Sequence, residues 1–124
     1  MLGSSELRAG FSSNESDSPM YTCENVVSRF RDRKRSANMV LCGTDCYADA
    51  QSRGNIKSPF DGNVVCGFDT MEYMLDNTFS KLGIDTDRVD HPLLLTEPLC
   101  NPEYSRGQMN ELLFEAYQVQ SVNY

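Results

Sequence analysis

Seven consecutive residues hold the densest positive charge of the sequence. The segment Arg29-Phe30-Arg31-Asp32-Arg33-Lys34-Arg35 carries five bases and one acid. Guanidinium and ammonium groups bind phosphate and carboxylate oxygens through charge-assisted hydrogen bonds. Two interpretations fit this basic segment. It is either a contact for DNA phosphates, an acidic protein face or the nuclear import machinery, or a solvated hairpin tip whose charges face water.

Five cysteines and one histidine are the other groups with potential chemistry. Cys42 and Cys46 are spaced C-x₃-C, and Cys23 or Cys66 could in principle join them around zinc. The sequence has no C-x₂-C pair and only one histidine, so buried, reduced thiols are the favoured interpretation. No nucleophile pattern surrounds His91. We therefore predict no metal site and no catalytic residue.

The overall composition limits the class of protein. The chain has 124 residues, of which 18 are acidic and 11 basic, for a net charge of −7. This length predicts one domain, and the acidic balance argues against a general nucleic-acid binder. Apolar runs such as Leu93 to Leu95 are far too short to span a membrane, and no secretory signal is visible. We expect an intracellular protein with reduced cysteines.

The first half of the chain predicts short strands on either side of the basic segment. Residues 4–11 alternate between apolar and polar side chains, which is typical of a strand. Residues 20–28 favour a second extended piece, and residues 39–42 a short apolar strand. The basic segment is polar throughout, so we expect a hairpin tip or a loop there. Residues 45–67 predict only a short helix, near 48–52.

An amphipathic helix is predicted over residues 69–82. Asp69 can cap its start, and Gly83 supplies a left-handed stop. Apolar side chains recur at spacings of three and four, which places them on one stripe of the helix. The stripe consists of Phe68, Met71, Leu75, Phe79 and Leu82.

A second helix is predicted over residues 106–117. Ser105 and Gln108 have the spacing of a capping box at its start. The helical period predicts one buried face. That face consists of Met109, Leu112, Leu113 and Ala116.

Two further strands complete an α/β pattern. Residues 92–96 form a continuous apolar strand of the kind that is buried on both faces, and residues 119–124 begin another. The order of strands and helices predicts an α/β fold. Two helices cannot cover both faces of such a sheet, so we expect the opening part of a larger α/β domain.

The segment from His91 to Pro102 resembles the HPxLLTE…NP signature of the actin family. The predicted helix Ser105–Tyr117 resembles the helix that follows this signature in the family. Upstream, Gly3-Ser4-Ser5 and Arg8-Ala9-Gly10-Phe11 are similar to the family's first hairpin, and residues 49–54 to its DEAQSKRG segment. The resemblance covers nearly the whole chain, and residues 91–117 are its most specific part.

The resemblance implies the actin fold, in which a ribonuclease-H-like sheet is duplicated in two lobes. Residues 1–124 would then be an N-terminal fragment of the actin-like ATPase domain. This fragment would be a partial first lobe with a mixed sheet and two main helices. Residues 29–67 would hold the small subdomain appended to that lobe.

The resemblance also implies which residues would face a nucleotide. Actin-type proteins hold phosphates between two hairpins, and Gly3-Ser4-Ser5 matches part of the first. Arg8 stands where the family has a phosphate-contacting lysine, and it keeps the charge but changes the donor geometry. Met1-Leu2 stands where the family has Asp-Asn, so the acid that organises the Mg²⁺ waters is missing. We expect a remnant of a phosphate hairpin and no cofactor for this fragment, with ATP and Mg²⁺ bound only by a longer parent protein.

Three short segments are most similar to nuclear actin-related members of the family: residues 58–61, 71–76 and 101–117. This likeness implies a non-catalytic scaffold subunit of a nuclear INO-eighty-type complex for nucleosome remodelling. Such a complex serves chromatin remodelling, transcription regulation and DNA repair. The partners would be protein subunits of the complex, and the basic segment would contact the nucleosome or DNA.

The basic segment lies where actin has the exposed loop that touches the next subunit in a filament. Because the segment here is short and highly charged, we expect that actin-type filaments are lost. No membrane partner is expected, since the apolar runs are too short to span a membrane. Two alternatives are an actin-like nucleotide-binding ATPase that acts through its own hydrolysis, and a cytoskeletal actin-related protein such as a filament-capping protein.

Overall fold

The computed structural model describes residues 5–13, 18–32, 34, 36–48, 50–84 and 88–124. Strands in this part of the chain are β1 (Glu6–Ala9), β2 (Tyr21–Glu24), β3 (Val27–Asp32), β4 (Ala37–Cys42), β5 (Ile56–Lys57), β6 (Phe60–Asp61), β7 (Val64–Val65), β8 (Leu93–Leu94) and β9 (Val122–Asn123). The helical elements are the 3₁₀ helix η1 (Gly43–Tyr47), α1 (Ala50–Arg53), α2 (Phe68–Lys81), α3 (Glu103–Glu111) and the π-helical turn η2 (Leu112–Ala116).

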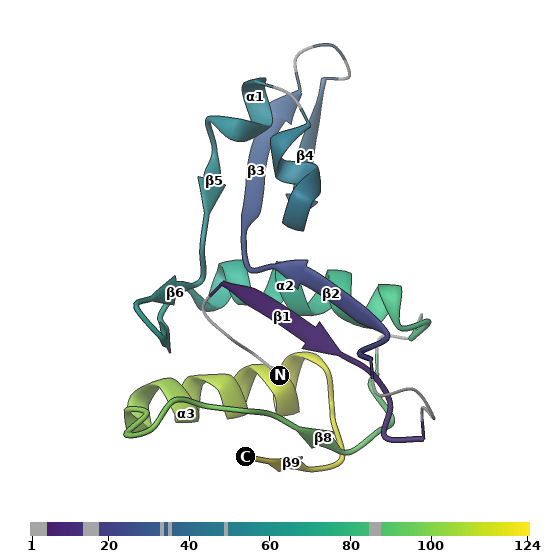
Figure 1. Cartoon of the computed structure of the whole chain (residues 1–124), viewed down its shortest axis with the longest axis vertical. Helices are drawn as coiled ribbons and strands as arrows, with labels where there is room; N and C mark the ends of the chain where they lie inside the picture. The colour runs from purple at the N-terminus through teal and green to yellow at the C-terminus, as the bar shows by residue number, and fades with distance from the viewer. Residues whose placement is uncertain (1–4, 14–17, 33, 35, 49, 85–87) are drawn as a thin grey trace.

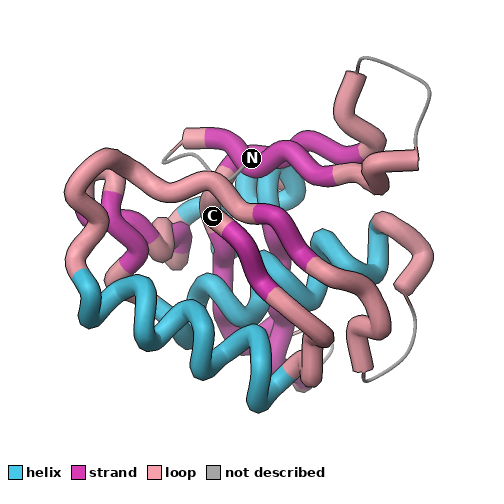
Figure 2. The backbone as a smooth tube through the Cα atoms, turned by 90° about the horizontal axis from the view of Figure 1, so that it is seen from below, coloured by secondary structure: helices cyan, strands magenta, loops and turns pink. Residues whose placement is uncertain are grey.

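The described strands form four small sheets. β1 pairs with β2, β6 with β7, and β3 with both β4 and β5, all antiparallel, whereas β8 and β9 are parallel. α2 and α3 are the two long helices and run across the molecule alongside one another (Figures 1 and 2). β3, β4, β5 and α1 extend away from them as an arm (Figure 1). The predicted α/β class with two main helices is confirmed.

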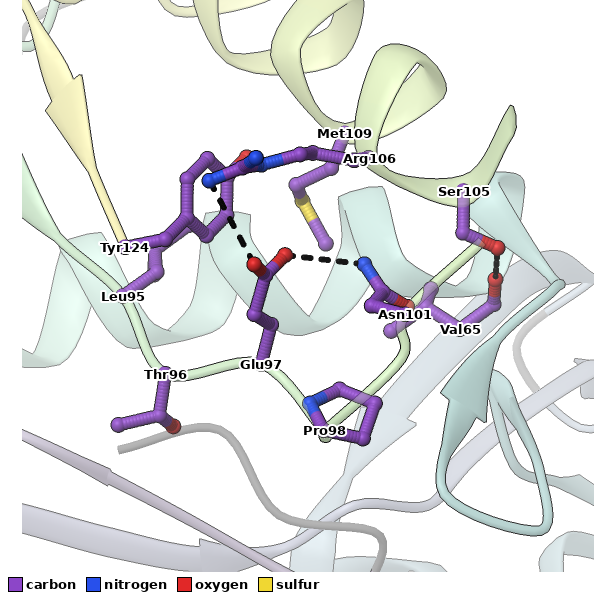
Figure 3. A pocket seen from close by; sticks show the side chains of 10 residues that line it. All are labelled: Val65, Leu95, Thr96, Glu97, Pro98, Asn101, Ser105, Arg106, Met109 and Tyr124. Carbon is purple, nitrogen blue, oxygen red and sulfur yellow. Dashed lines mark hydrogen bonds and ion pairs between the residues drawn. The ribbon is translucent and has the colours of Figure 1, made fainter. Parts of the chain in front are cut away.

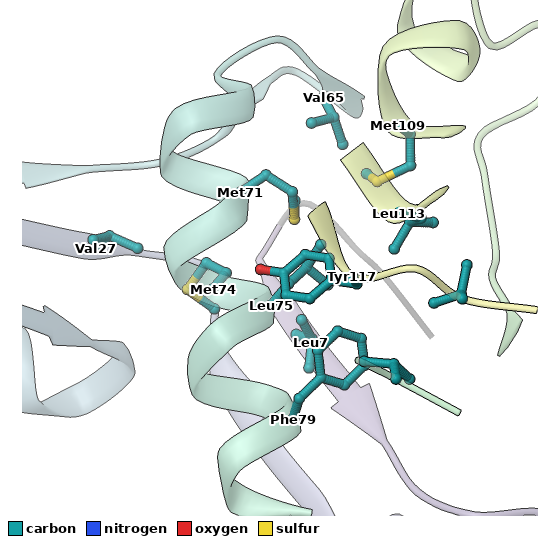
Figure 4. Close-up of a cluster of buried hydrophobic side chains, with 12 residues drawn as sticks. Leu7, Val27, Val65, Met71, Met74, Leu75, Phe79, Met109, Leu113 and Tyr117 are labelled. Atoms are coloured by element: carbon teal, nitrogen blue, oxygen red, sulfur yellow. The ribbon is translucent and has the colours of Figure 1, made fainter. Parts of the chain in front are cut away.

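α2 is the centre of the apolar core. Met71, Leu75 and Phe79 are buried, as the stripe predicts. Met74 is buried as well, on a different side of the helix. Figure 4 shows the reason: Met74 and Val27 of β3 lie on one side of α2, and the side chains of α3 and η2 lie on the other. A helix covered from two directions carries a wider apolar surface than a single stripe.

The two ends of α2 differ in how well the sequence predicts them. The predicted cap at Asp69 is wrong, because the helix begins at Phe68 with Gly67 as its N-cap and no side-chain cap. Gly83 is confirmed as the stop, with a φ of +86°. The Ile84 amide donates to the Phe79 carbonyl (2.9 Å) and the Gly83 amide to the Ser80 carbonyl (3.1 Å). This pair of bonds is a Schellman motif, which requires a left-handed residue.

The second helix begins earlier than predicted and is buried on a different set of positions. α3 starts at Glu103 after Pro102, and no side-chain cap is present, so the predicted capping box at Ser105 is wrong. Proline suits a helix start because its missing N–H needs no partner there. The buried positions are four residues apart along α3 and the π-helical turn that follows it. They are Ser105, Met109, Leu113 and Tyr117.

The predicted buried residue Ala116 is therefore exposed, and Tyr117 takes its place. A π-helical turn has more residues per turn than an α-helix, so it holds a strict spacing of four on one face. The Tyr117 ring packs edge-to-face on Phe79, with ring centroids 5.1 Å apart. Its hydroxyl donates to Asp76 Oδ1 at 2.6 Å. These contacts join the end of the second helix to α2.

The apolar strand predicted at 92–96 is only partly correct. β8 is short, and its Leu94 side chain is 77% exposed, so this strand is not buried on both faces within the described structure. β9 pairs with it in parallel, Leu93 with Val122. The strand predicted near the end of the chain is confirmed at Val122–Asn123.

Residues 45–67 contain more structure than the sequence predicts. A short helix is present, but it covers Ala50–Arg53 and is preceded by the 3₁₀ helix η1. β5, β6 and β7 follow and have two residues each. Strands of two residues carry too little periodicity to be recognised. β5 pairs with the distant β3, whereas β6 and β7 pair with each other across the turn at Gly62 and Asn63.

Candidate functional site

The basic segment lies on the arm, and half of it is a strand. The predicted hairpin is present, because β3 and β4 pair on either side of a turn at Lys34. Arg29 and Arg31 lie in β3 itself, so the prediction of a tip or a loop is wrong for these two positions. Side chains alternate between the two faces of a strand. Ser28 and Phe30 point to one face and are buried or half-buried, whereas Arg29 and Arg31 point to the other and are exposed. The segment is polar in composition, yet Arg29 and Arg31 alternate with Ser28 and Phe30, and this alternation indicates a strand.

One face of the arm sheet is covered by α1 and η1. The buried Ser28 hydroxyl donates to the Ser52 carbonyl at 2.7 Å. The Cys46 thiol, which is fully buried, lies 3.2 Å from the Leu41 carbonyl. The Gln51 amide donates to the Arg31 carbonyl at 2.6 Å. The bonds of Ser28 and Gln51 hold β3 against α1, and the Cys46 contact holds η1 against β4.

The opposite face of the sheet is open and basic. In the register of the sheet, Arg29 lies opposite Val40, and Arg31 opposite Asn38. All four residues are exposed, and Val40 has 40% of its surface accessible. Lys57 of β5 is also exposed and lies on this face, because it pairs with Val27. We call these five residues the open face; Asn38, Val40 and Lys57 are absent from the sequence prediction because only the register of the strands brings them there.

Arg29 is held at the base of the open face. Its guanidinium carbon lies 4.9 Å from the centre of the Tyr73 ring on α2. A guanidinium over an aromatic face keeps its charge while its orientation becomes restricted. Near the same place the Cys42 thiol lies 3.7 Å from the Tyr73 carbonyl. Arg29 therefore also contributes to the attachment of the arm to α2.

The turn between β3 and β4 continues the positive charge. Lys34 is exposed, and its amide donates to Asp32 Oδ1 at 2.9 Å. Ser36 is exposed and has a φ of +48°. Arg33 and Arg35 lie outside the described residues. The described part of the basic segment thus consists of a strand with two outward arginines and a turn.

The predicted phosphate hairpin is described only in part. Gly3 and Ser4 lie outside the described residues, whereas Ser5 is an exposed bend before β1. The Ser5 carbonyl accepts a bond from the Asn25 amide at 3.1 Å. Arg8 bonds the Glu6 carboxylate through Nε (3.0 Å) and Nη2 (2.8 Å). A forked pair of this kind uses two of the five guanidinium donors.

Three of the five cysteines, Cys23, Cys42 and Cys46, lie where the arm joins β2. Burial raises the pKa of the Cys42 thiol to about 12, and it also raises the pKa of Cys23 and of Cys46. A metal-binding or nucleophilic cysteine needs a depressed pKa, so these shifts favour protonated structural thiols. Within the described ranges no three His, Cys, Asp or Glu side chains come together in a group that could hold a metal ion.

A small cavity of about 30 Å³ lies between α3, the loop after β8 and the end of the chain (Figure 3). Arg106 Nη2 lies 3.5 Å from Glu97 Oε1. The Arg106 guanidinium carbon lies 4.4 Å from the centre of the Tyr124 ring. The Asn101 amide donates to Glu97 Oε2 at 3.1 Å. A space this small holds about one water molecule, so it is not a nucleotide pocket.

Helices that could cross a membrane are not found among the described residues: none is both long and apolar enough.

Comparison with known proteins gives a consistent result. A family model described as Actin matches residues 2–124. The chain is 50% identical over 122 residues to the actin-like protein arp5 of Schizosaccharomyces pombe. It is 38% identical to actin-related protein 5 of Saccharomyces cerevisiae over 124 residues and to that of Homo sapiens over 126 residues.

These matches cover nearly all of the chain but a small part of each relative. The alignments include 98%, 99% and 98% of this chain, and 16%, 16% and 21% of the fission yeast, budding yeast and human proteins. The chain thus spans about a fifth or less of the length of the curated relatives it matches. The family match over almost every residue confirms the resemblance given by the 91–117 segment. The chain belongs to the actin family.

Proposed function

We propose that the chain is part of a non-catalytic actin-related scaffold subunit of a nuclear INO-eighty-type nucleosome-remodelling complex. In this role it would serve transcription regulation and DNA repair. The observation that carries the proposal is the similarity to proteins named actin-related protein 5, from yeasts to human, across 98% or more of this chain. Its partners would be the other protein subunits of the complex.

The region around β1 supports a role without nucleotide hydrolysis. Arg8 matches a phosphate-contacting lysine of the family, and its Nε and Nη2 atoms donate hydrogen bonds to the Glu6 carboxylate. A phosphate would have to compete with this carboxylate for the same donors. Met1-Leu2 replaces the Asp-Asn that would organise a Mg²⁺ ion. We propose that Gly3, Ser4, Ser5 and Arg8 are the remnant of a phosphate hairpin and that this fragment takes no cofactor.

The arm supports a role in contact with the nucleosome. We propose that residues 29–67 are the small appended subdomain of the lobe and that their basic segment binds nucleosomal DNA or an acidic protein face. Arg29 and Arg31 project from one rigid strand about 7 Å apart, and Lys34 continues the charge at the turn. We propose that actin-type filaments are lost, because this segment is short and highly charged where actin has the exposed loop that touches the next subunit.

Affinity purification tests the main proposal. The complete protein, tagged in cells, should copurify with a remodelling ATPase and its partner subunits from nuclear extract, measured by quantitative mass spectrometry. Recovery without any remodeller subunit, or a location outside the nucleus, would refute the scaffold role. A cytoskeletal fraction rich in actin would instead favour the cytoskeletal alternative.

Steady-state phosphate release by the complete protein separates the scaffold from the ATPase alternative. We expect no steady-state release of phosphate above background when Mg²⁺ and ATP are supplied. Turnover that falls on substitution Arg8→Gln would favour the ATPase. Turnover that is equal in the Arg8→Gln protein and in the unchanged protein would point to a contaminating enzyme and leave the scaffold role intact.

The DNA contact is tested with a matched pair of charge removals. Arg31→Gln and Lys81→Gln each remove one exposed positive charge, the first on the open face and the second at the end of α2. Binding of a labelled DNA duplex is measured by fluorescence anisotropy across a salt series. Arg31→Gln should lower the slope of log K against log salt by about one, because one phosphate contact is lost. Equal effects of the two substitutions would argue against a specific contact at the arm.

A further inference from the structure

The turn at the end of the arm carries a hydroxyl group that the proposed function does not use. Ser36 is the last residue before β4, it is exposed, and its φ of +48° places it in the left-handed region at the tip of the β3–β4 hairpin. Exposed hairpin tips are the parts of a fold that other enzymes reach most easily. Neither the core nor a strand ladder depends on the side chain of a residue at this position.

The sequence before Ser36 is unlike that before any other hydroxyl in the chain. Arg31 stands five residues before it, Arg33 three, Lys34 two and Arg35 one. No other serine or threonine of the sequence has a basic residue three positions earlier; Ser80, for example, has Asn77 there. A kinase whose peptide groove is acidic selects a serine by basic residues on its N-terminal side, through electrostatic complementarity.

We propose that Ser36 is a phosphorylation site for an arginine-directed serine kinase, and that its phosphate weakens the binding of anions by the arm. The Ser36 hydroxyl oxygen attacks the γ-phosphorus of ATP held by the kinase. The new bond joins that oxygen to phosphorus, the bond to the β-phosphate oxygen breaks, and ADP leaves. The hydroxyl proton passes to the catalytic aspartate of the kinase.

The fold allows access at a small cost. The last rung of the β3–β4 ladder pairs Asp32 with Ala37, and the next pairs Arg31 with Asn38. Opening the single Asp32–Ala37 rung would free Ser36 and Ala37 from the ladder. The bond from Gln51 to the Arg31 carbonyl would keep the rest of β3 in place. The acceptor hydroxyl can therefore be presented to a kinase without unfolding the arm.

The effect on charge follows from arithmetic. Residues 29–36 carry five bases and one acid, so their net charge is 5 − 1 = +4. A phosphoserine adds about −1.5 to −2 near neutral pH, which removes roughly half of that charge. Its three oxygens also compete with DNA phosphates for the donors of Lys34 and its neighbours. The consequence for DNA rests on the proposed contact at the arm, whereas the modification of Ser36 does not.

The site is tested by phosphorylating the complete protein with the catalytic subunit of a cyclic-AMP-dependent kinase and ATP. Fragment spectra of the peptides that cover residues 1–124 should place a phosphate on Ser36. Ser36→Ala should abolish this phosphate, whereas Ser80→Ala, which removes another exposed serine, should leave it unchanged. Absence of phosphate from Ser36, with or without phosphate on other residues of this chain, would overturn the site.

The effect on binding is tested with the labelled DNA duplex at low salt. The phosphorylated protein should bind about tenfold or more weakly than the unmodified protein, with a slope of log K against log salt smaller by about two. Phosphate on Ser36 with unchanged affinity would overturn the effect on binding. An unmodified protein that does not bind the duplex would refute the proposed DNA contact and this effect together, whereas the mapping experiment alone decides the site.

Discussion

Two regions of the molecule are stabilised in different ways. One is built on α2, α3 and η2 and is called the body; the other is the arm, formed by residues 27–57. The body buries large apolar side chains, among them Met71, Met74 and Leu113, which are fully inaccessible to solvent. In the arm the fully buried residues beyond Val27 are small and polar or sulfur-containing: Ser28, Cys46 and Ser52. Burial of large side chains contributes most of the stability of a fold, so the arm must depend more on individual hydrogen bonds.

The difference between the regions matches the roles proposed for them. A body with a dense core can hold its position within a larger assembly. The arm has one covered face and one open face, and its open face can carry a concentration of charge because little apolar burial is required there. A function on the arm can therefore change through surface chemistry while the body remains unaltered.

The largest effect is expected in the body. Leu113→Ala should reduce the free energy of unfolding by about 2–5 kcal/mol, because it leaves a cavity at a fully buried position. Leu99→Ala makes the same chemical change at a side chain that is 97% exposed, and it should cost less than about 0.5 kcal/mol. Urea unfolding followed by circular dichroism measures both. Equal costs would mean that the core assigned to α2, α3 and η2 is not the main source of stability.

The next effect should be confined to the arm. Ser28→Ala removes the donor to the buried Ser52 carbonyl and should cost about 1–3 kcal/mol locally. Amide hydrogen exchange should accelerate in β3, β4 and α1 while the amides of α2 keep their protection. Ser80→Ala, at an exposed site, serves as the control. Faster exchange throughout α2 in the Ser28→Ala protein would show that the arm and the body unfold as one unit.

The elements that local sequence patterns predict correctly lie in the body more than in the arm. The stripe of α2 and the stop at Gly83 were predictable because helical period and glycine chemistry are local properties. The buried Tyr117 was not, since it depends on a π-helical turn that interrupts the period assumed for the helix. In the arm, the run of bases predicts a hairpin tip or a loop, whereas Arg29 and Arg31 lie in β3 before the turn. Their common face is fixed by pairing with β4, and the partner Asn38 is seven residues away from Arg31.

The candidate site was predictable in its charge and not in its shape. A run of bases is visible in any sequence, whereas the open face needs the register that adds Val40 and Lys57. The contact between Arg29 and Tyr73 joins positions that are far apart in the chain, and no local pattern indicates it. The forked bond from Arg8 to Glu6 is closer in sequence. It follows the period of a strand, which places side chains two residues apart on one face.

A third test concerns the end of α2. Gly83→Ala should cost about 1–2 kcal/mol, because a φ of +86° is unfavourable for a residue with a Cβ atom. The space around the added carbon is open, so the cost is conformational and not steric contact with a neighbour. Thermal unfolding should show a lower midpoint. An unchanged midpoint would mean that the Schellman motif does not hold the end of the helix.

The smallest effect should have the opposite sign and provides the control for Gly83. Gly107 lies inside α3, it is exposed, and a Cβ atom there would meet no atom within 4 Å. Gly107→Ala should therefore raise the free energy of unfolding by about 0.5–1 kcal/mol, because alanine loses less backbone freedom when a helix forms. The same thermal measurement applies to both glycines. Since α3 belongs to the body, the gain should appear in the global transition and leave hydrogen exchange in the arm unchanged. Stabilisation of the arm by Gly107→Ala would contradict the separation of the two regions.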